Sequence, residues 1–163
     1  MKPQSLIVCF MFTLTSILCS SYITHAMGKS ELQSFAEQGN VDAQYQLGEM
    51  LMDEAEACDA ETRKTCYVES LLDSIMWFKI VSQRPLGGFS YSGAKTILEQ
   101  MGRASEVFGD RLGLIQLVTN KLASNCIEKF YVRCGFRFDK NLFPANTVEN
   151  IFLIMRRLKE QQR

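Results

Sequence analysis

Apolar residues follow a helical spacing along much of the chain beyond residue 29. Ala43, Leu47 and Leu51 fall at i, i+4 and i+8, which places them on one stripe of a helix. A broader apolar face predicts a second helix that packs on both sides; its members are Val68, Leu71, Leu72, Ile75, Phe78 and Val81. We therefore expect residues 30–84 to form the end of a short helix and two whole helices, with the later chain stacked on that pair.

Residues typical of helix ends divide the same stretch. Gly39 predicts the end of the short helix, because glycine adopts the left-handed conformation without a Cβ clash. Asn40 is a good N-cap for the next helix, and Ser30 with Gln33 forms a capping-box pattern. Gly48 lies inside a helix, where glycine costs about 1 kcal/mol relative to alanine, so we expect another helix to approach closely there.

The later segments also favour helices separated by loops. A short apolar face spans residues 94–101, a longer helix is expected over about 105–124, and a last helix over about 145–161. Residues 127–143 carry alternating aromatic side chains, which leaves two short strands as an alternative to loop and broken helix. We favour loop and broken helix there because helices flank the segment. The fold class that follows is all-α.

Three runs of residues carry a resemblance to a known family. The runs FAEQGN at 35–40, AQYQLG at 43–48 and WFK at 77–79 resemble the Sel-one-like repeat family, whose helix-pair repeats are related to tetratricopeptide repeats. The resemblance covers a clear repeat at about 30–84 and a degenerate second unit at about 92–125. It implies a short right-handed stack of antiparallel helix pairs, an α/α repeat solenoid closed by a capping helix at about 145–161. Such stacks bind other proteins.

The amino terminus has the pattern of a secretory signal peptide. Lys2 precedes an apolar run from Leu6 to Leu18, and Thr24 and Ala26 are small residues at the −3 and −1 positions of a cleavage site. We expect residues 1–26 to be removed and residues 27–163 to form a single exported domain, periplasmic or secreted, with no membrane span. The alternative is an uncleaved amino-terminal anchor, since the apolar stretch is at the short limit for a spanning helix.

The cysteines outside the predicted leader are consistent with export. Cys58, Cys66, Cys126 and Cys134 are an even number of cysteines for an oxidising compartment, and both sequence-local pairs have the same C-x7-C spacing. We predict disulfides between Cys58 and Cys66 and between Cys126 and Cys134, which clip two loops. A shared zinc site is the alternative, although structural zinc sites usually use closer spacings.

Composition limits the chemistry that the chain can perform. Lys and Arg number 18 and Asp and Glu number 18, so the chain lacks the basic footprint of a nucleic-acid-binding protein. The one histidine, His25, lies in the predicted leader, which removes the usual general base of serine and cysteine nucleophiles. No phosphate-binding or dinucleotide-binding glycine motif is present. We therefore predict a protein that is not an enzyme, with no metal and no cofactor.

Polar residues of the first whole helix are the predicted contact with a partner. Gln46, Glu49 and Asp53 fall at i, i+3 and i+7, away from the apolar stripe, and the resemblance implies that this helix lines the inner surface of a stack. An ordinary solvated helix face is the alternative. Asp53 also belongs to an acidic cluster with Glu54, Glu56 and Glu61, and paired carboxylates can run glycoside hydrolysis. A solvated acidic edge explains that cluster more simply.

The aromatic residues fall into two groups. Trp77 and Phe78 are expected in the core between stacked helices. Phe130, Tyr131, Phe136 and Phe138 are too many for a short loop to leave exposed, so we expect some of them to close the end of the stack. If several prove exposed, they mark a binding patch instead.

The function predicted from these observations is that of an exported, non-catalytic protein–protein interaction module whose partner is another protein. Two alternatives from the same sequence are a periplasmic immunity or inhibitor protein against a secreted toxin, and a carboxylate-based hydrolase acting on cell-wall or glycan substrates. A structural protein anchored by an uncleaved amino terminus is a further class.

Overall fold

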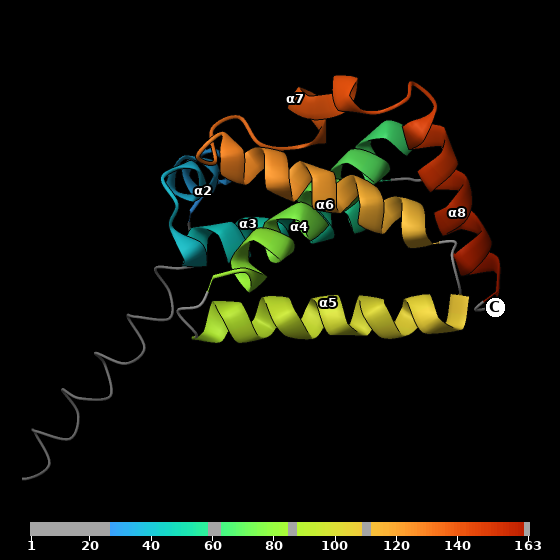
Figure 1. The fold of residues 1–163 in the computed structure, drawn as a ribbon, viewed down its shortest axis with the longest axis horizontal. Coiled ribbons are helices and arrows are strands. Elements are labelled where there is room, and N and C mark those ends of the chain that lie inside the picture. Colours follow the sequence, from blue (N-terminus) through green and yellow to red (C-terminus); the bar gives the residue numbers. More distant parts are fainter. Residues whose placement is uncertain (1–26, 59–62, 85–87, 109–111, 162–163) are drawn as a thin grey trace, which may run out of the picture.

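The computed structural model describes residues 27–58, 63–84, 88–108 and 112–161, and within them every regular element is helical (Figure 1). The predicted signal peptide lies outside the described residues. The elements in chain order are α2 (Lys29–Glu37), α3 (Val41–Ala57), α4 (Lys64–Ser82), α5 (Phe89–Phe108), α6 (Gly113–Glu128), α7 (Phe136–Asp139), the 3-10 helix η2 (Lys140–Leu142) and α8 (Thr147–Gln161). In the part of the chain so described, no helix has the length and apolar character needed to cross a membrane.

The turn between α2 and α3 forms as its sequence predicts. Gly39 has a φ of +84°, the left-handed conformation in which glycine ends a helix. The Asn40 side chain caps α3 by accepting a hydrogen bond from the Ala43 N–H at 2.9 Å. Buried Gln44 then donates to the Ala36 carbonyl at 3.0 Å and so fixes α2 against α3.

The predicted capping box at the start of α2 is wrong. The helix begins at Lys29 with Gly28 as its N-cap, and no side chain caps it. Ser30 therefore lies inside the first turn, two residues beyond the N-cap position from which a capping side chain reaches back. The Gln33 side chain instead donates to Glu37 at 2.8 Å along the helix surface.

Helices α3 and α4 form an antiparallel hairpin. Three contacts show the direction of the two helices, because successively later residues of the first contact successively earlier residues of the second. Tyr45 contacts Phe78 with ring centroids 5.7 Å apart, the Gly48 carbonyl accepts from the Ser74 hydroxyl at 2.7 Å, and Cys58 pairs with Cys66. Gly48 is required by packing, because a Cβ there would lie 2.8 Å from the Phe78 ring. The apolar stripe Ala43, Leu47 and Leu51 is buried in this interface, as predicted.

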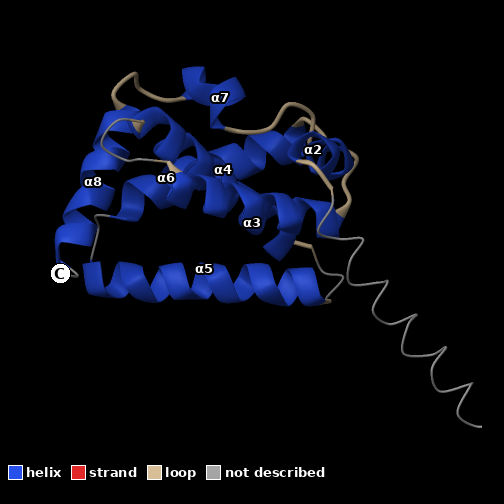
Figure 2. Cartoon of the chain, turned by 180° about the vertical axis from the view of Figure 1, so that it is seen from behind, coloured by secondary structure: helices blue, strands red, loops and turns tan. Residues whose placement is uncertain are grey.

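Helix α4 is the centre of the molecule. It is buried on most of its circumference, and both Trp77 and Phe78 are about 1% exposed, which places them in the core as predicted. Helix α5 packs antiparallel to it, with Val81 near Ala94, and α6 runs parallel to it, with Lys79 bonded to Asn120. Helices α5 and α7 lie on opposite sides of the hairpin (Figures 1 and 2).

The later helices differ from the predicted boundaries. Helix α5 continues through Gly102 to Phe108, whereas the sequence analysis placed a break before residue 105. The neighbouring residues 94–101 are good helix formers, so one glycine weakens the helix without ending it. Helices α5 and α6 each pack on α4, and the described residues of these two helices have little direct contact with each other. The all-α fold is thus confirmed. The arrangement of α5 and α6 differs from that of α3 and α4, which pack closely as a hairpin.

The chain after α6 is mostly turn and short helix, as predicted for residues 127–143. Turns occupy residues 129–133, and α7 and η2 follow directly. Helix α8 then packs against the start of α4, where Ile151 is buried and the Lys64 ammonium lies 4.9 Å from the centre of the Phe152 ring.

Candidate protein-binding surface

The segment joining α6 to α7 has the least ordinary backbone in the described chain. It is closed by Cys126 and Cys134, whose Sγ atoms lie at disulfide distance and whose Cα atoms are 5.1 Å apart. Between them Phe130, Tyr131 and Arg133 have φ values of 52°, 67° and 51°. The left-handed conformation costs a residue with a Cβ about 1–2 kcal/mol, so surrounding contacts must hold this segment in place.

Tyr131 supplies the first of these contacts. Its ring lies 3.5 Å from the position that a Cβ on Gly39 would occupy, so the turn between α2 and α3 forms one wall of its site. The guanidinium of Arg84, which follows the end of α4, lies 4.8 Å from the centre of the same ring. The loop is thereby fixed to two elements that are distant in sequence.

Asp73 of α4 supplies the second contact. Its carboxylate accepts the backbone N–H of Phe136 at 2.5 Å, and Gly135 leaves the room, because a Cβ there would lie 2.7 Å from the carboxylate. Burial raises the pKa of the Asp73 carboxyl from the ordinary 3.8 to about 7, against the opposing effect of the Phe136 hydrogen bond. Nearby Glu69 and Asp139 raise this pKa further, and Lys29 lowers it.

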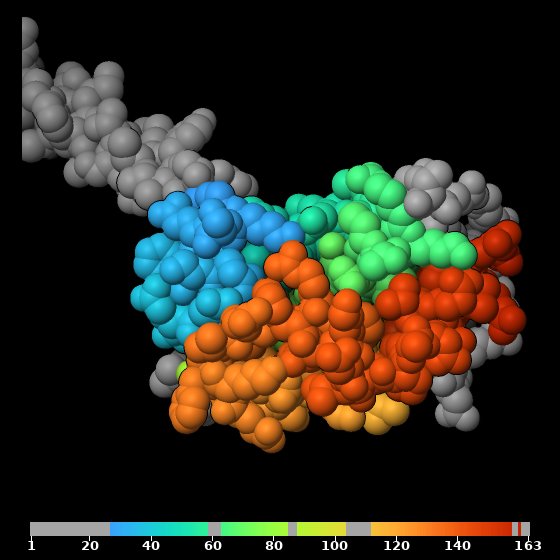
Figure 3. All heavy atoms as spheres, turned by 90° about the horizontal axis from the view of Figure 1, so that it is seen from above, coloured from blue at the N-terminus to red at the C-terminus, as the bar shows by residue number. Residues whose placement is uncertain are grey.

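The outer side of this segment carries an exposed aromatic and basic cluster. We define the Phe138 patch as Lys129, Val132, Arg133, Arg137 and Phe138. Four of these, all except Arg137, line a shallow depression of about 580 Å³. Val132 is 51% exposed and Phe138 39% exposed. In Figure 3 the orange atoms of this part of the chain lie between the blue atoms of α2 and the red atoms of α8.

The charges of the Phe138 patch are arranged around its aromatic ring. The guanidinium groups of Arg133 and Arg137 lie 5.3 and 4.9 Å from the centre of the Phe138 ring. Lys129 forms an ion pair with Asp139, whose side chain is buried. The two arginines therefore supply the exposed positive charge, and each guanidinium keeps a planar set of donors that matches a carboxylate.

Phe130 extends the exposed apolar surface of the same loop. It is 81% exposed, whereas Tyr131 and Phe136 are covered, the latter by stacking on Phe143 with ring centroids 5.5 Å apart. The late aromatics thus divide as the sequence analysis allowed: Tyr131 and Phe136 close the fold, and Phe130 and Phe138 face outward. Solvent-exposed aromatics beside arginines are typical of interaction surfaces.

The predicted contact residues Gln46, Glu49 and Asp53 lie on α3, a different element from the Phe138 patch. Gln46 is half-buried, while Glu49 and Asp53 are exposed. Burial and a hydrogen bond with Glu49 raise the pKa of Tyr45 to about 12, so Glu49 is engaged with its own helix. The contact of these three residues with a partner remains a prediction.

The acidic cluster and the cysteines are placed as follows. Asp53 and Glu56 are exposed, Glu54 forms an ion pair with Lys29, and Glu61 lies outside the described residues. The cysteines form two separate pairs at disulfide distance, those predicted, which is not the arrangement of a shared zinc site. Within residues 27–58, 63–84, 88–108 and 112–161, no three His, Cys, Asp or Glu side chains gather as a metal site.

Four residues of the Phe138 patch were not predicted from the sequence: Lys129, Val132, Arg133 and Arg137. The signal for them in the sequence is the run KFYVRCGFRF, in which basic residues are interleaved with apolar ones; it begins three residues after Cys126 and contains Cys134. The sequence does not reveal which side of this segment faces inward, because the contact with Asp73 decides that.

Comparisons with known proteins add no relative. No protein-family model, no curated protein and no solved structure matches the chain. The candidate surface therefore depends on its own geometry.

Proposed function

We propose that this protein is an exported, non-catalytic protein-binding module of the Sel-one-like repeat type that binds its partner through the Phe138 patch. The observation that carries this proposal is the exposure of Phe130, Val132 and Phe138 on a segment that several long-range contacts hold rigid. A surface that is ordered before binding loses less conformational entropy when the partner docks. Two cysteine pairs at disulfide distance fit an oxidising compartment.

The chemistry of the patch indicates what the partner presents. Arg133 and Arg137 favour carboxylates, and the apolar depression beside Val132 and Phe138 favours an aromatic or aliphatic side chain. The partner is therefore a protein whose contacting segment combines acidic residues with an apolar one. Arginines in contact with one ring favour such a discrete site over a lipid surface, to which flexible lysines usually bind.

The test begins with the protein that wild type retains from the exporting cell, purified and titrated by calorimetry. Arg133→Glu and Phe138→Ser are each expected to weaken binding at least about 30-fold, the effect of losing an interface hot spot. Leu117→Ser is the matched control, because Leu117 is 65% exposed on α6 and lies outside the patch. Unchanged affinity in both patch variants would reject the patch as the binding surface.

A further variant separates the two candidate surfaces. Asp53→Lys changes the predicted α3 face and leaves the patch intact, so its affinity is expected to equal that of wild type. If Asp53→Lys loses the partner while the patch variants keep it, the α3 face predicted from the sequence is the binding surface instead.

A further inference from the structure

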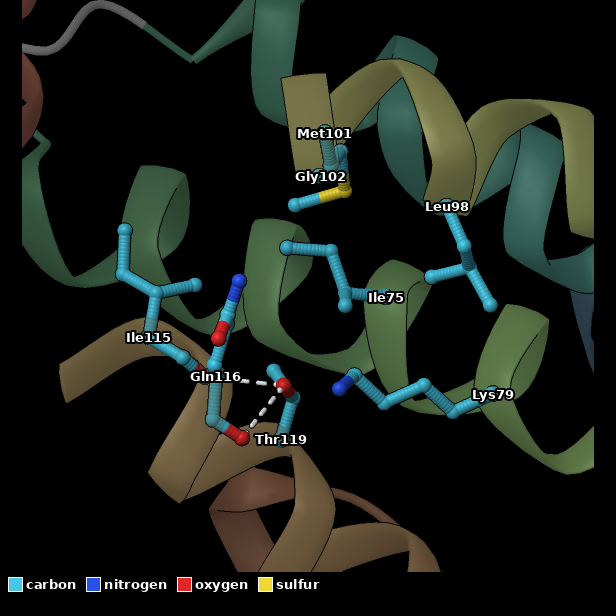
Figure 4. Close-up of a pocket in the computed structure, with 8 residues that line it drawn as sticks. All are labelled: Ile75, Lys79, Leu98, Met101, Gly102, Ile115, Gln116 and Thr119. Atoms are coloured by element: carbon cyan, nitrogen blue, oxygen red, sulfur yellow. Dashed lines mark hydrogen bonds between the residues drawn. The ribbon is translucent and has the colours of Figure 1, made fainter. Parts of the chain in front are cut away.

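A second, smaller cleft lies between α4, α5 and α6, outside the Phe138 patch. It has a volume of about 110 Å³, and its lining includes Ile75, Lys79, Leu98, Met101, Ile115 and Thr119 (Figure 4). It exists because α5 and α6 each pack on α4 but have little contact with each other.

Most of the cleft wall is formed by apolar side chains, Gln116 also lines it, and one end is basic. Leu98 and Met101 descend from α5 toward Ile75 of α4, and the amino end of Lys79 points toward Thr119 of α6 (Figure 4). The Thr119 hydroxyl donates to the Ile115 carbonyl at 2.8 Å, so its proton is already used. The ammonium of Lys79 is therefore the strong donor at this end.

Lys79 is half-buried beside a neutral partner. Its ammonium donates to the side-chain oxygen of Asn120, and among the described residues no carboxylate lies within ion-pair distance of it. Burial lowers the pKa of Lys79, because the charged form loses hydration. A partly desolvated cation of this kind gains more from an anion than a fully solvated one does.

We propose that this cleft binds a short-chain aliphatic monocarboxylate, with the carboxylate on the Lys79 ammonium and the alkyl chain against Ile75, Leu98 and Met101. The volume limits the chain, because a cavity of about 150 Å³ holds one benzene molecule. A four-carbon acid has as many non-hydrogen atoms as benzene, so we take it as the upper limit for this cleft. This site is independent of the protein-binding function proposed for the Phe138 patch.

The first experiment needs only wild-type protein, three probes of the same chain length, and acetate as a shorter acid. Butyrate, butanol and butylammonium are titrated at constant pH and ionic strength while backbone amide shifts are followed by NMR. Butyrate is expected to give saturable shifts at Leu98, Ile115 and Thr119. It should bind about 15-fold more tightly than acetate, since butyrate has two more methylenes and each buried methylene adds about fourfold. Equal binding of butanol or butylammonium, or shifts that do not saturate, would overturn the proposal.

A pair of variants then tests the role of Lys79. Lys79→Met keeps the length of the side chain and removes its charge, and should weaken butyrate binding at least about tenfold, the loss of one charged hydrogen bond. Lys95→Met is the control, because Lys95 is an exposed lysine of α5 outside the cleft. Circular dichroism establishes that both variants fold. Undiminished binding by Lys79→Met would equally overturn the proposal.

Discussion

The carboxyl group of Asp73 makes this protein less stable as the pH rises. Most carboxylates of folded proteins act in the opposite direction and stabilise the folded state less as the pH falls. In the folded state the pKa of Asp73 is about 7, against 3.8 ordinarily. Between these two values the folded protein holds a proton that the unfolded chain releases. The contribution of Asp73 to stability is therefore complete below about pH 4 and falls as the pH rises through about 7.

The size of this effect follows from the difference between the two pKa values. A change of about three pKa units corresponds to about 4 kcal/mol in the free energy of unfolding. Asp73 keeps some contact with solvent, which screens its charge, so we expect a loss of about 2–4 kcal/mol between pH 4 and pH 8. Asp73→Asn removes the titration and keeps an oxygen that can accept the Phe136 N–H.

Urea unfolding at a series of pH values measures this effect directly. Trp77 is the one tryptophan of the chain and is buried, so its fluorescence reports the unfolding of the core. Asp73→Asn is expected to match wild type near pH 4 and to exceed its stability by about 2–4 kcal/mol at pH 8. The control is Asp53→Asn, an exposed carboxylate on α3, which should follow the wild-type curve.

One outcome would refute this reasoning. If wild type and Asp73→Asn differ by the same free energy at every pH from 4 to 8, then Asp73 does not retain a proton in the folded state. The carboxylate would then act only as the acceptor that fixes α7 to α4.

Two further predictions concern packing and the first cysteine pair. Gly48→Ala should destabilise the protein by about 1–2 kcal/mol, because the new Cβ meets the buried Phe78 ring and this overpacking exceeds the gain in helix propensity. Gly102→Ala is the control, because no atom lies within 4 Å of the new Cβ. It should be neutral or stabilising by up to about 1 kcal/mol. Equal effects in urea unfolding would contradict the packing argument. Replacing both Cys58 and Cys66 by serine should cost about 2.5 kcal/mol, the loop entropy for their separation of 8 residues, and an unchanged unfolding midpoint would exclude a stabilising bridge.

The first half of the fold was predictable because its signals are local. The glycine at 39, the asparagine at 40 and the stripe of Ala43, Leu47 and Leu51 each act through neighbours within two helical turns. The capping box failed because Gly28, two residues before Ser30, is already the N-cap of α2. The prediction was wrong about the position of the cap and correct about the helix.

The candidate site was less accessible to prediction because distant residues decide it. Phe130, Tyr131, Phe136 and Phe138 are chemically similar in the sequence. Contacts from α4, from the α2–α3 turn and from Phe143 determine which two are covered. The cleft beside Lys79 depends on how far α5 and α6 stand apart. No short-range pattern encodes that spacing.

The contact of Tyr131 with Gly39 and Arg84 has a consequence for how this chain can be divided. In a regular repeat array each unit touches only its neighbours, so units can be removed from one end with gradual loss of stability. Here a late segment returns to the first turn of the domain and to the end of its central helix. A fragment ending at Glu128 would leave the surface around Gly39 and Arg84 uncovered. We therefore expect the domain to fold as a single cooperative unit.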